Sequence, residues 1–171
     1  MLRKGIVLAV LCLLPAVAQA QARGPFELTL GGSGANGSRF DGFTGSIQGS
    51  IGYFFTDAVE LSVRQSLDYT DVGVPKQLNG STRVALDLHL PLGDQGQFLP
   101  FVGVNVGYVY GDSVSDTWEG APEAGIKWFV NQTTFIYGSI EYQIFFDRHS
   151  NTGQNFSDGQ FVYGVGVGFR F

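Results

Sequence analysis

Residues 159–171 read GQFVYGVGVGFRF, and this stretch decides the fold class. Its odd-numbered residues from Phe161 to Phe171 are all apolar or aromatic, whereas Gly164, Gly166, Gly168 and Arg170 stand between them. Side chains that alternate with period two point to opposite faces of a β-strand. The stretch therefore predicts a strand with one apolar face and one nearly bare face.

The same alternation recurs earlier in the chain. We expect further clear strands within residues 43–53, 59–67 and 83–90. The apolar faces of these strands consist of Phe43, Ile47, Ile51 and Tyr53; Val59, Leu61, Val63 and Leu67; and Val84, Leu86, Leu88 and Leu90. Four more strands are expected at Phe26–Gly31, Phe98–Tyr110, Trp118–Val130 and Thr134–Phe146. In the last of these, Phe135, Tyr137 and Phe145 share a face with Glu141, which leaves its register open.

The eight expected strands and the segments between them favour a barrel that crosses a membrane. Most of the strands are about 9 to 13 residues long, close to the ~9 to 11 residues that a tilted transmembrane strand needs. Long polar segments (32–42, 68–80, 111–117, 147–159) alternate with short turns (55–58, 92–97, 130–133). Short turns on one rim and long loops on the other are typical of outer-membrane barrels. With an even strand number, both termini are expected on the periplasmic rim.

The polar faces indicate which side of the wall meets lipid. They combine glycine, serine and threonine with charged residues of both signs: Glu27, Glu60, Arg64, Arg83, Asp87, Glu119, Glu123, Lys127, Glu141 and Arg170. Small residues and paired charges can fill the narrow interior of an eight-stranded barrel. The apolar faces are then left for lipid, the reverse of a soluble ligand-binding barrel. The prediction is an all-β, eight-stranded, antiparallel up-and-down transmembrane β-barrel.

Aromatic residues near the strand ends are expected to form belts at the two membrane interfaces. One belt would contain Phe26, Phe54, Phe55, Phe98, Trp128, Phe135 and Phe171. The other would contain Phe40, Phe43, Tyr69, Tyr110, Trp118 and Phe161.

The first twenty residues have the layout of a secretory signal peptide: Arg3 and Lys4, an apolar run, and then Ala18-Gln19-Ala20. We expect residues 1–20 to be the signal and residues 21–171 the barrel domain, with cleavage after Ala20 or Ala22. Cleavage removes two of the 10 basic residues and leaves the 15 acidic ones, so the formal net charge falls from −5 to −7. This charge disfavours nucleic acid as a partner. The mature chain has no cysteine, which excludes disulfides and thiolate metal sites.

Two stretches resemble known families. Residues 159–171 look like the last strand of bacterial outer-membrane barrels, which typically ends in phenylalanine. Residues 52–61 (GYFFTDAVEL) resemble the second strand, periplasmic turn and third strand of OmpX-like, OmpW-like and opacity-type proteins, and in pattern the likeness extends to the OmpA transmembrane domain. The resemblance implies an outer-membrane location, contact with outer-membrane lipids and lipopolysaccharide, a monomer, and recognition by the barrel-assembly machinery through the strand ending at Phe171. Because the sequence stops at the end of the last expected strand, we expect no C-terminal peptidoglycan-binding domain.

The sequence offers few candidate chemical sites. His149 and Ser150 faintly resemble the His-x-Ser-Asn motif of outer-membrane lipid A deacylases, but adjacent residues of an extended strand point to opposite faces. We therefore interpret them as part of a polar loop. His89 is expected in the lumen and not at a metal. The acidic loop residues, Asp68, Asp71, Asp112, Asp116, Asp147 and Asp158, lack the spacing of a calcium site.

Three functions follow as hypotheses. The first is a non-enzymatic outer-membrane protein that contributes to envelope structure or to surface contacts through its loops, with an unknown surface ligand. The second is a lipid A-modifying enzyme of the deacylase kind. The third is a narrow channel, which a lumen filled by charged side chains disfavours. We predict no catalytic, cofactor or metal site.

Overall fold

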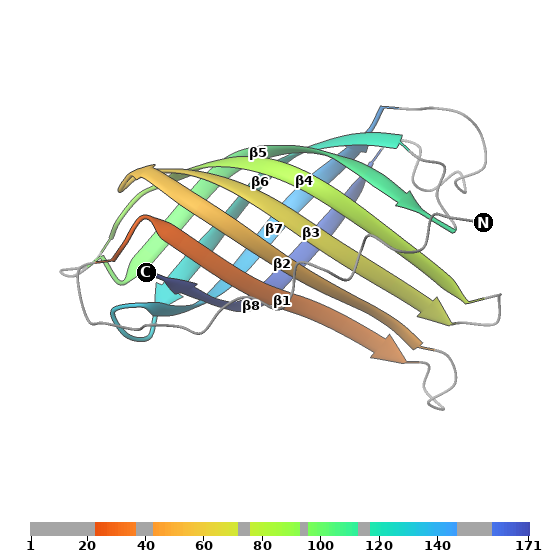
Figure 1. The fold of residues 1–171 in the computed structure, drawn as a ribbon, viewed down its shortest axis with the longest axis horizontal. Helices are drawn as coiled ribbons and strands as arrows, with labels where there is room; N and C mark the ends of the chain where they lie inside the picture. The colour runs from red at the N-terminus through yellow and green to blue at the C-terminus, as the bar shows by residue number, and fades with distance from the viewer. Residues whose placement is uncertain (1–22, 37–42, 72–75, 93–95, 113–116, 147–158) are drawn as a thin grey trace.

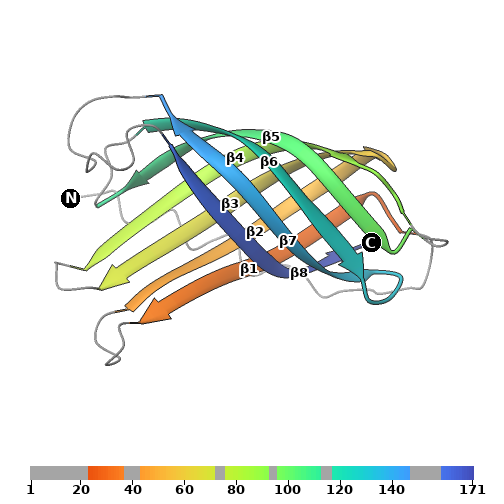
Figure 2. The ribbon, with the colours of Figure 1, turned by 180° about the vertical axis from the view of Figure 1, so that it is seen from behind.

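The computed structural model describes residues 23–36, 43–71, 76–92, 96–112, 117–146 and 159–171. These residues form eight antiparallel strands that close into one barrel in sequence order (Figures 1 and 2). The strands are β1 (Phe26–Asn36), β2 (Phe43–Thr56), β3 (Val59–Asp71), β4 (Gln77–His89), β5 (Phe98–Gly111), β6 (Thr117–Phe129), β7 (Thr134–Phe145) and β8 (Gln160–Arg170). The predicted eight-stranded up-and-down barrel is confirmed. None of the described residues forms a helix long and apolar enough to cross a membrane.

One end of the barrel, here called the turn rim, carries the short connections between strands. Only Asp57 and Ala58 separate β2 from β3, and the Thr56 hydroxyl accepts hydrogen bonds from the backbone N–H groups of Ala58 and Val59. At the β6–β7 turn the Asn131 side chain does the same for two backbone N–H groups. Such side-chain bonds replace the strand ladder where the chain reverses.

The first and last strands meet at the turn rim. Phe26 and Phe171 exchange two backbone hydrogen bonds, of 3.0 and 2.8 Å. The opposite end, here called the loop rim, is where Asn36 pairs with Phe43 and where β4 begins at Gln77. The short-turn rim therefore carries the beginning of β1 and the end of β8, as the even strand number predicted.

Several strands extend further toward the loop rim than the sequence predicted. β1 continues past Gly31 to Asn36, and β4 begins at Gln77 instead of Arg83. The added residues, such as Ser33 and Asn79, are largely small or polar, so they interrupt the apolar alternation used to find strands. Backbone pairing does not need that alternation, and the ladder continues through them.

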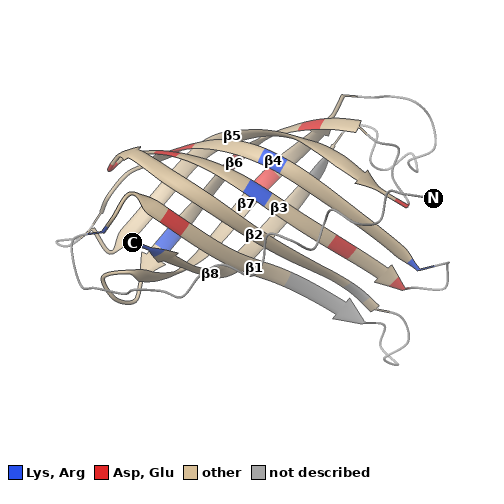
Figure 3. Ribbon diagram, viewed as in Figure 1, with Lys and Arg blue, Asp and Glu red and all other residues tan. Residues whose placement is uncertain are grey.

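The barrel is apolar outside and polar inside, as predicted. The predicted apolar faces of β2, β4 and β8 are exposed, and so are Val102, Val104 and Val106 of β5. These outward residues form a continuous surface, here called the apolar belt. By contrast, charged residues occur along the whole length of the barrel wall (Figure 3), and side chains such as Glu27, Glu60 and Arg83 are almost fully buried.

Two aromatic residues predicted at the membrane interface lie inside instead. Phe54 and Phe135 are 4% and 0% exposed, whereas Phe26, Phe55 and Trp128 are exposed as expected. The side chains of even-numbered residues in β2 point inward, so Phe54 lies in the lumen and the adjacent Phe55 points outward. On β7, Phe135 and Tyr137 do share the inward face with Glu141, so the register that the sequence left open is settled by aromatic side chains in the lumen.

Candidate functional site

The inward face of the barrel is filled in layers, starting from the turn rim. The first layer is an aromatic floor made by Leu99, Phe129 and Phe135, with Tyr137 packed against it. The Phe129 and Phe135 rings lie 5.0 Å apart between centroids, and Gly168 leaves the space that Phe135 occupies. An added Cβ at Gly168 would fall 2.1 Å from Cζ of Phe135. Large rings are thus accommodated only because the facing strand is bare.

Lys127 forms the second layer. Its Nζ lies 2.5 Å from Oε1 of Glu27 and 2.7 Å from Oε2 of Glu60. The same ammonium lies 5.3 to 5.6 Å from the ring centroids of Phe54, Phe101 and Phe135. Two carboxylates and three ring faces therefore surround one buried cation, which offsets much of its desolvation.

His89 lies beside this layer, as predicted for a lumen residue. Its ring packs between Phe54 and Phe101, at centroid distances of 5.0 and 5.3 Å. Within the described residues neither ring nitrogen has a hydrogen-bond partner, although Nε2 is 3.5 Å from Oε2 of Glu60. Those residues also contain no group of three or more His, Cys, Asp or Glu side chains arranged to hold a metal ion.

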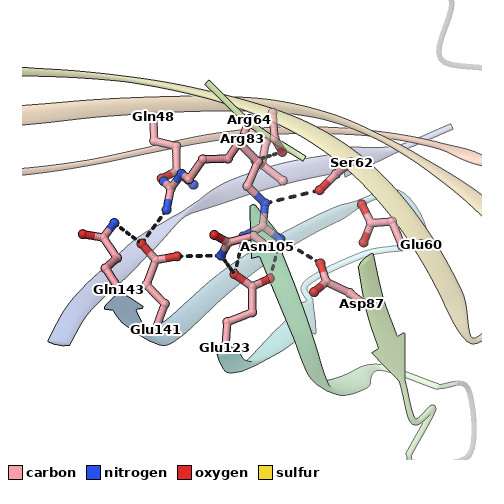
Figure 4. Close-up of polar contacts among 12 residues, drawn as sticks. Gln48, Glu60, Ser62, Arg64, Arg83, Asp87, Asn105, Glu123, Glu141 and Gln143 are labelled. Atoms are coloured by element: carbon pink, nitrogen blue, oxygen red, sulfur yellow. Dashed lines mark hydrogen bonds and ion pairs between the residues drawn. The ribbon is translucent and has the colours of Figure 1, made fainter. Parts of the chain in front are cut away.

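The third layer is centred on Arg64 (Figure 4). Both terminal nitrogens of its guanidinium donate to Glu123, each at 2.7 Å, and Nη2 also reaches Asp87 at 2.7 Å. Asn105 donates to Glu123 at 2.7 Å and to Glu141 at 3.1 Å, which links this layer to the next. Side chains from five strands thus meet around one bidentate pair.

Arg83 forms the fourth layer, toward the loop rim. It donates to Glu141 at 2.5 Å and to the side-chain Oε1 of Gln48 at 2.6 Å. Gln143 also donates to Glu141. Arg64 and Glu141, which the sequence placed on the polar faces, are enclosed and paired: Asp87 and Glu123 are the partners of Arg64, and Arg83 is the charged partner of Glu141.

Sequence reasoning missed the aromatic floor and Asn105. Alternation along β5 could have revealed part of this interior. The side chains of Val102, Val104 and Val106 point outward, so the odd-numbered residues Leu99, Phe101 and Asn105 point inward. His149, Ser150, Asp116, Asp147, Asp158 and Phe40 lie outside the described residues. The lumen instead holds oppositely charged side chains that pair with one another across the barrel.

Comparison with known proteins agrees with this geometry. The family model described as outer membrane protein beta-barrel domain matches residues 6–171. The chain belongs to this family of outer-membrane barrels. A curated relative is outer membrane porin F of Pseudomonas aeruginosa, 29% identical over 136 residues, which are 72% of this chain and 37% of the relative. The chain thus spans little more than a third of that relative's length.

Solved barrels of outer-membrane proteins share the fold. The N-terminal barrel domain of Pseudomonas aeruginosa OprF superposes with a TM-score of 0.61 at 20% identity, covering 88% of this chain and all of that domain. OprG of the same organism gives 0.59 at 13% identity, covering 88% of this chain and 97% of OprG. Neisserial surface protein A superposes with a TM-score of 0.58 at 13% identity, covering 85% of this chain and 95% of that protein. At these identities the likeness concerns the fold.

Proposed function

We propose that this outer-membrane barrel is a non-conducting, non-enzymatic protein that contributes to envelope structure or to contacts at the cell surface. The observation that supports the proposal is the filled lumen. The aromatic floor, the Lys127 layer and the layers of Arg64 and Arg83 occupy the axis one above another. Ions would have to cross buried, mutually paired charges, and paired charges inside a narrow barrel leave no hydrated path.

A channel is the second candidate, and the similarity to outer membrane porin F favours it. Planar-bilayer recording of the purified barrel separates the two proposals. We expect no stable conductance steps from protein whose folding has been verified in the same preparation. The relative itself, reconstituted in parallel, is the positive control for the recording. Repeated stable openings from this chain would establish the channel and overturn the sealed-barrel proposal.

The proposed orientation places the turn rim in the periplasm and the loop rim outside. Asp57 on the turn rim has a side chain that is 99% exposed, and Asp112 on the loop rim is also exposed. Single substitutions Asp57→Cys and Asp112→Cys therefore offer matched thiols, because the mature chain is expected to have no other. In intact cells a membrane-impermeant maleimide should label only the Asp112→Cys variant. Labelling of Asp57→Cys alone would reverse the orientation.

The proposed partners follow from the same placement. The apolar belt contacts outer-membrane lipids and lipopolysaccharide, the strand ending at Phe171 engages the barrel-assembly machinery, and the protein acts as a monomer. Phe171 is exposed and hydrogen-bonded to Phe26, so it presents its ring at the barrel surface. Cross-linking from position 171 during assembly in cells tests the second of these contacts.

A further inference from the structure

The three described residues that precede β1, which are Arg23, Gly24 and Pro25, are here called the strap. Its root is fixed beside the neighbours of β1 in the barrel. The Pro25 carbonyl accepts a hydrogen bond from the backbone N–H of Phe54 on β2 at 2.7 Å. The Gly24 carbonyl accepts one from Nε of Arg170 on β8 at 2.9 Å. The strap therefore starts on the side of the turn rim where β8, β1 and β2 lie next to one another.

The tip of the strap reaches the opposite side of the turn rim. Nη1 of Arg23 donates to the Gly96 carbonyl at 2.7 Å, although 73 residues separate the two in sequence. Gly96 lies two residues before β5, and β5 is four strands from β1 in either direction around the closed barrel. The guanidinium carbon also lies 3.8 Å from the ring centroid of Phe129, the last residue of β6. Arg23 therefore spans the mouth of the lumen at this rim.

The strap covers the aromatic floor from the turn rim. Phe129 belongs to that floor and is almost fully buried, with the Arg23 guanidinium on its ring. A second guanidinium, that of Arg170, lies 3.6 Å from the ring centroid of Phe54, and its Nε is bonded to the Gly24 carbonyl. A planar guanidinium stacks on an aromatic face while its N–H groups bind other partners. Two arginines, one in the strap and one bonded to it, thus cover two rings at this end of the lumen.

A close backbone approach determines the path of the strap. A Cβ added to Gly24 would lie 2.1 Å from the carbonyl carbon of Phe171. The strap therefore runs directly against the backbone of the last residue, and a side chain at position 24 would have to push it away. Gly24→Ala is thus a means of displacing the strap that leaves Arg23 and the floor unchanged in sequence.

The strap lies outside both the strand ladder and the ion-paired layers. The ladder of β1 and β2 begins at Phe26, after the strap, and the nearest ion-paired layer is held by Lys127 with Glu27 and Glu60. Segments near a chain end and outside a hydrogen-bonded ladder open locally at a lower cost than the core. The strap can therefore leave the mouth while the barrel stays closed.

We propose that the strap is a lid on the turn-rim mouth of the lumen, held shut by the Arg23 guanidinium. When it is seated, the lid shields the aromatic floor from solutes on that side of the membrane. When it is released, it opens a recess whose floor contains Phe129 and Leu99. The position that Arg23 leaves, a ring face beside the Gly96 carbonyl, suits another guanidinium. The lid lies outside the ion-paired layers, so the proposal does not depend on whether the axis conducts.

The test measures how fast a small uncharged thiol reagent, methyl methanethiosulfonate, reaches Leu99→Cys in the mature barrel folded in phospholipid vesicles. Leu99 is buried in the floor, and Cys12 lies in the expected signal peptide, so the mature chain offers no competing thiol. We expect Arg23→Ala to raise the labelling rate about tenfold, because a charged hydrogen bond and a ring contact are lost. Gly24→Ala, which keeps Arg23, should raise the rate as well. Unchanged rates in both strap variants would overturn the lid.

Two controls separate a lid from a general loosening of the barrel. Lys76→Ala removes an exposed cation at the loop rim and should leave the labelling of Leu99→Cys unchanged. Ser66→Cys provides a second buried reporter, on the half of β3 nearer the loop rim, and Arg23→Ala should leave its labelling rate unchanged. A similar rise at both reporters would show that the variant loosens the whole barrel, and it would contradict a lid.

Chemical rescue identifies the group that holds the lid. Ethylguanidinium chloride should slow the labelling of Leu99→Cys in the Arg23→Ala variant by about threefold, because it restores a guanidinium to the ring face. It should have no such effect in the Lys76→Ala variant, in which Arg23 still occupies the position. Sodium chloride at the same concentration controls for ionic strength. If ethylguanidinium slowed labelling no more than sodium chloride did, the guanidinium would not be the group that holds the lid, and the proposal would fail.

Discussion

Arg64 on β3 holds Glu123 on β6 with both terminal nitrogens of its guanidinium, across the lumen and 59 residues apart in sequence. Neither strand neighbours the other in the barrel order. The pair therefore ties two parts of the wall that backbone hydrogen bonds do not join. Its burial makes the loss of one member costly, because the remaining charge stays inside without its partner.

Removal of this arginine should destabilise the barrel strongly. We expect Arg64→Met to lower the free energy of unfolding by about 3–5 kcal/mol, since Glu123 and Asp87 lose their common cation. The measurement is urea unfolding in lipid vesicles, and a double-mutant cycle with Glu123→Gln gives the coupling. The control is Lys76–Asp71, at 3.8 Å with the Lys76 side chain 73% exposed, where coupling should stay below about 1 kcal/mol. Similar coupling in both cycles would show that the lumen pair is not special.

The bare face of β8 should tolerate no side chain opposite Phe135. Gly168→Ala places a Cβ 2.1 Å from Cζ of Phe135, so folding should fail or require displacement of the aromatic floor. Gly138→Ala on β7 is the matched control, because its nearest neighbour would be 3.9 Å away. Folding yield in detergent measures both, and Phe135→Leu should partly rescue Gly168→Ala. Equal yields for the two single variants would refute the packing argument.

If the apolar belt lies in the membrane, the cost of a charged substitution on it should depend on the depth of the residue in the bilayer. Val104 lies mid-strand on the outward face of β5, whereas Val130 follows β6 on the turn rim. We expect Val104→Arg to cost about 2–4 kcal/mol of unfolding free energy and Val130→Arg about 0–1 kcal/mol, because an arginine near the interface reaches water. Vesicle unfolding measures both values. If Val130→Arg proved the costlier change, the belt would be wrongly placed.

The backbone hydrogen bonds that close the barrel should make the folded chain resistant to detergent. An unboiled sample is expected to migrate differently from a boiled one on a denaturing gel, because backbone groups paired around the barrel are not released without heat. Circular dichroism confirms folding before loading. Identical migration of a folded, unboiled sample would argue against a closed barrel.

Lipid A should be unchanged by this protein. A nucleophile and base must lie within about 2.6 to 3.2 Å, and adjacent residues such as His149 and Ser150 seldom meet this requirement in extended chain. Mass spectrometry of lipid A from cells producing the wild type or the Ser150→Ala variant gives the answer. Loss of an acyl chain with the wild type alone would make the protein an enzyme.

Alternation in the sequence was sufficient to predict the strands, because a period of two determines on which face of a strand each side chain lies. It therefore also predicted which face meets lipid and which charged residues lie in the lumen. The expectation that aromatic residues near strand ends form interface belts was wrong for Phe54 and Phe135, because alternation places both side chains on the inward face. Partners could not be predicted at all. Lys127 meets Glu27, 100 residues away, because of the tilt and stagger of the closed sheet.

The two hydrogen bonds between Phe26 and Phe171 also bear on the order of assembly. They join positions at opposite ends of the described chain, so their formation closes the largest loop in the molecule and carries the greatest entropic cost. Until they form, the folding intermediate is an open sheet with two edges unpaired. Such edges are tolerated in water but not in hydrocarbon, so ring closure and entry into the bilayer must proceed together.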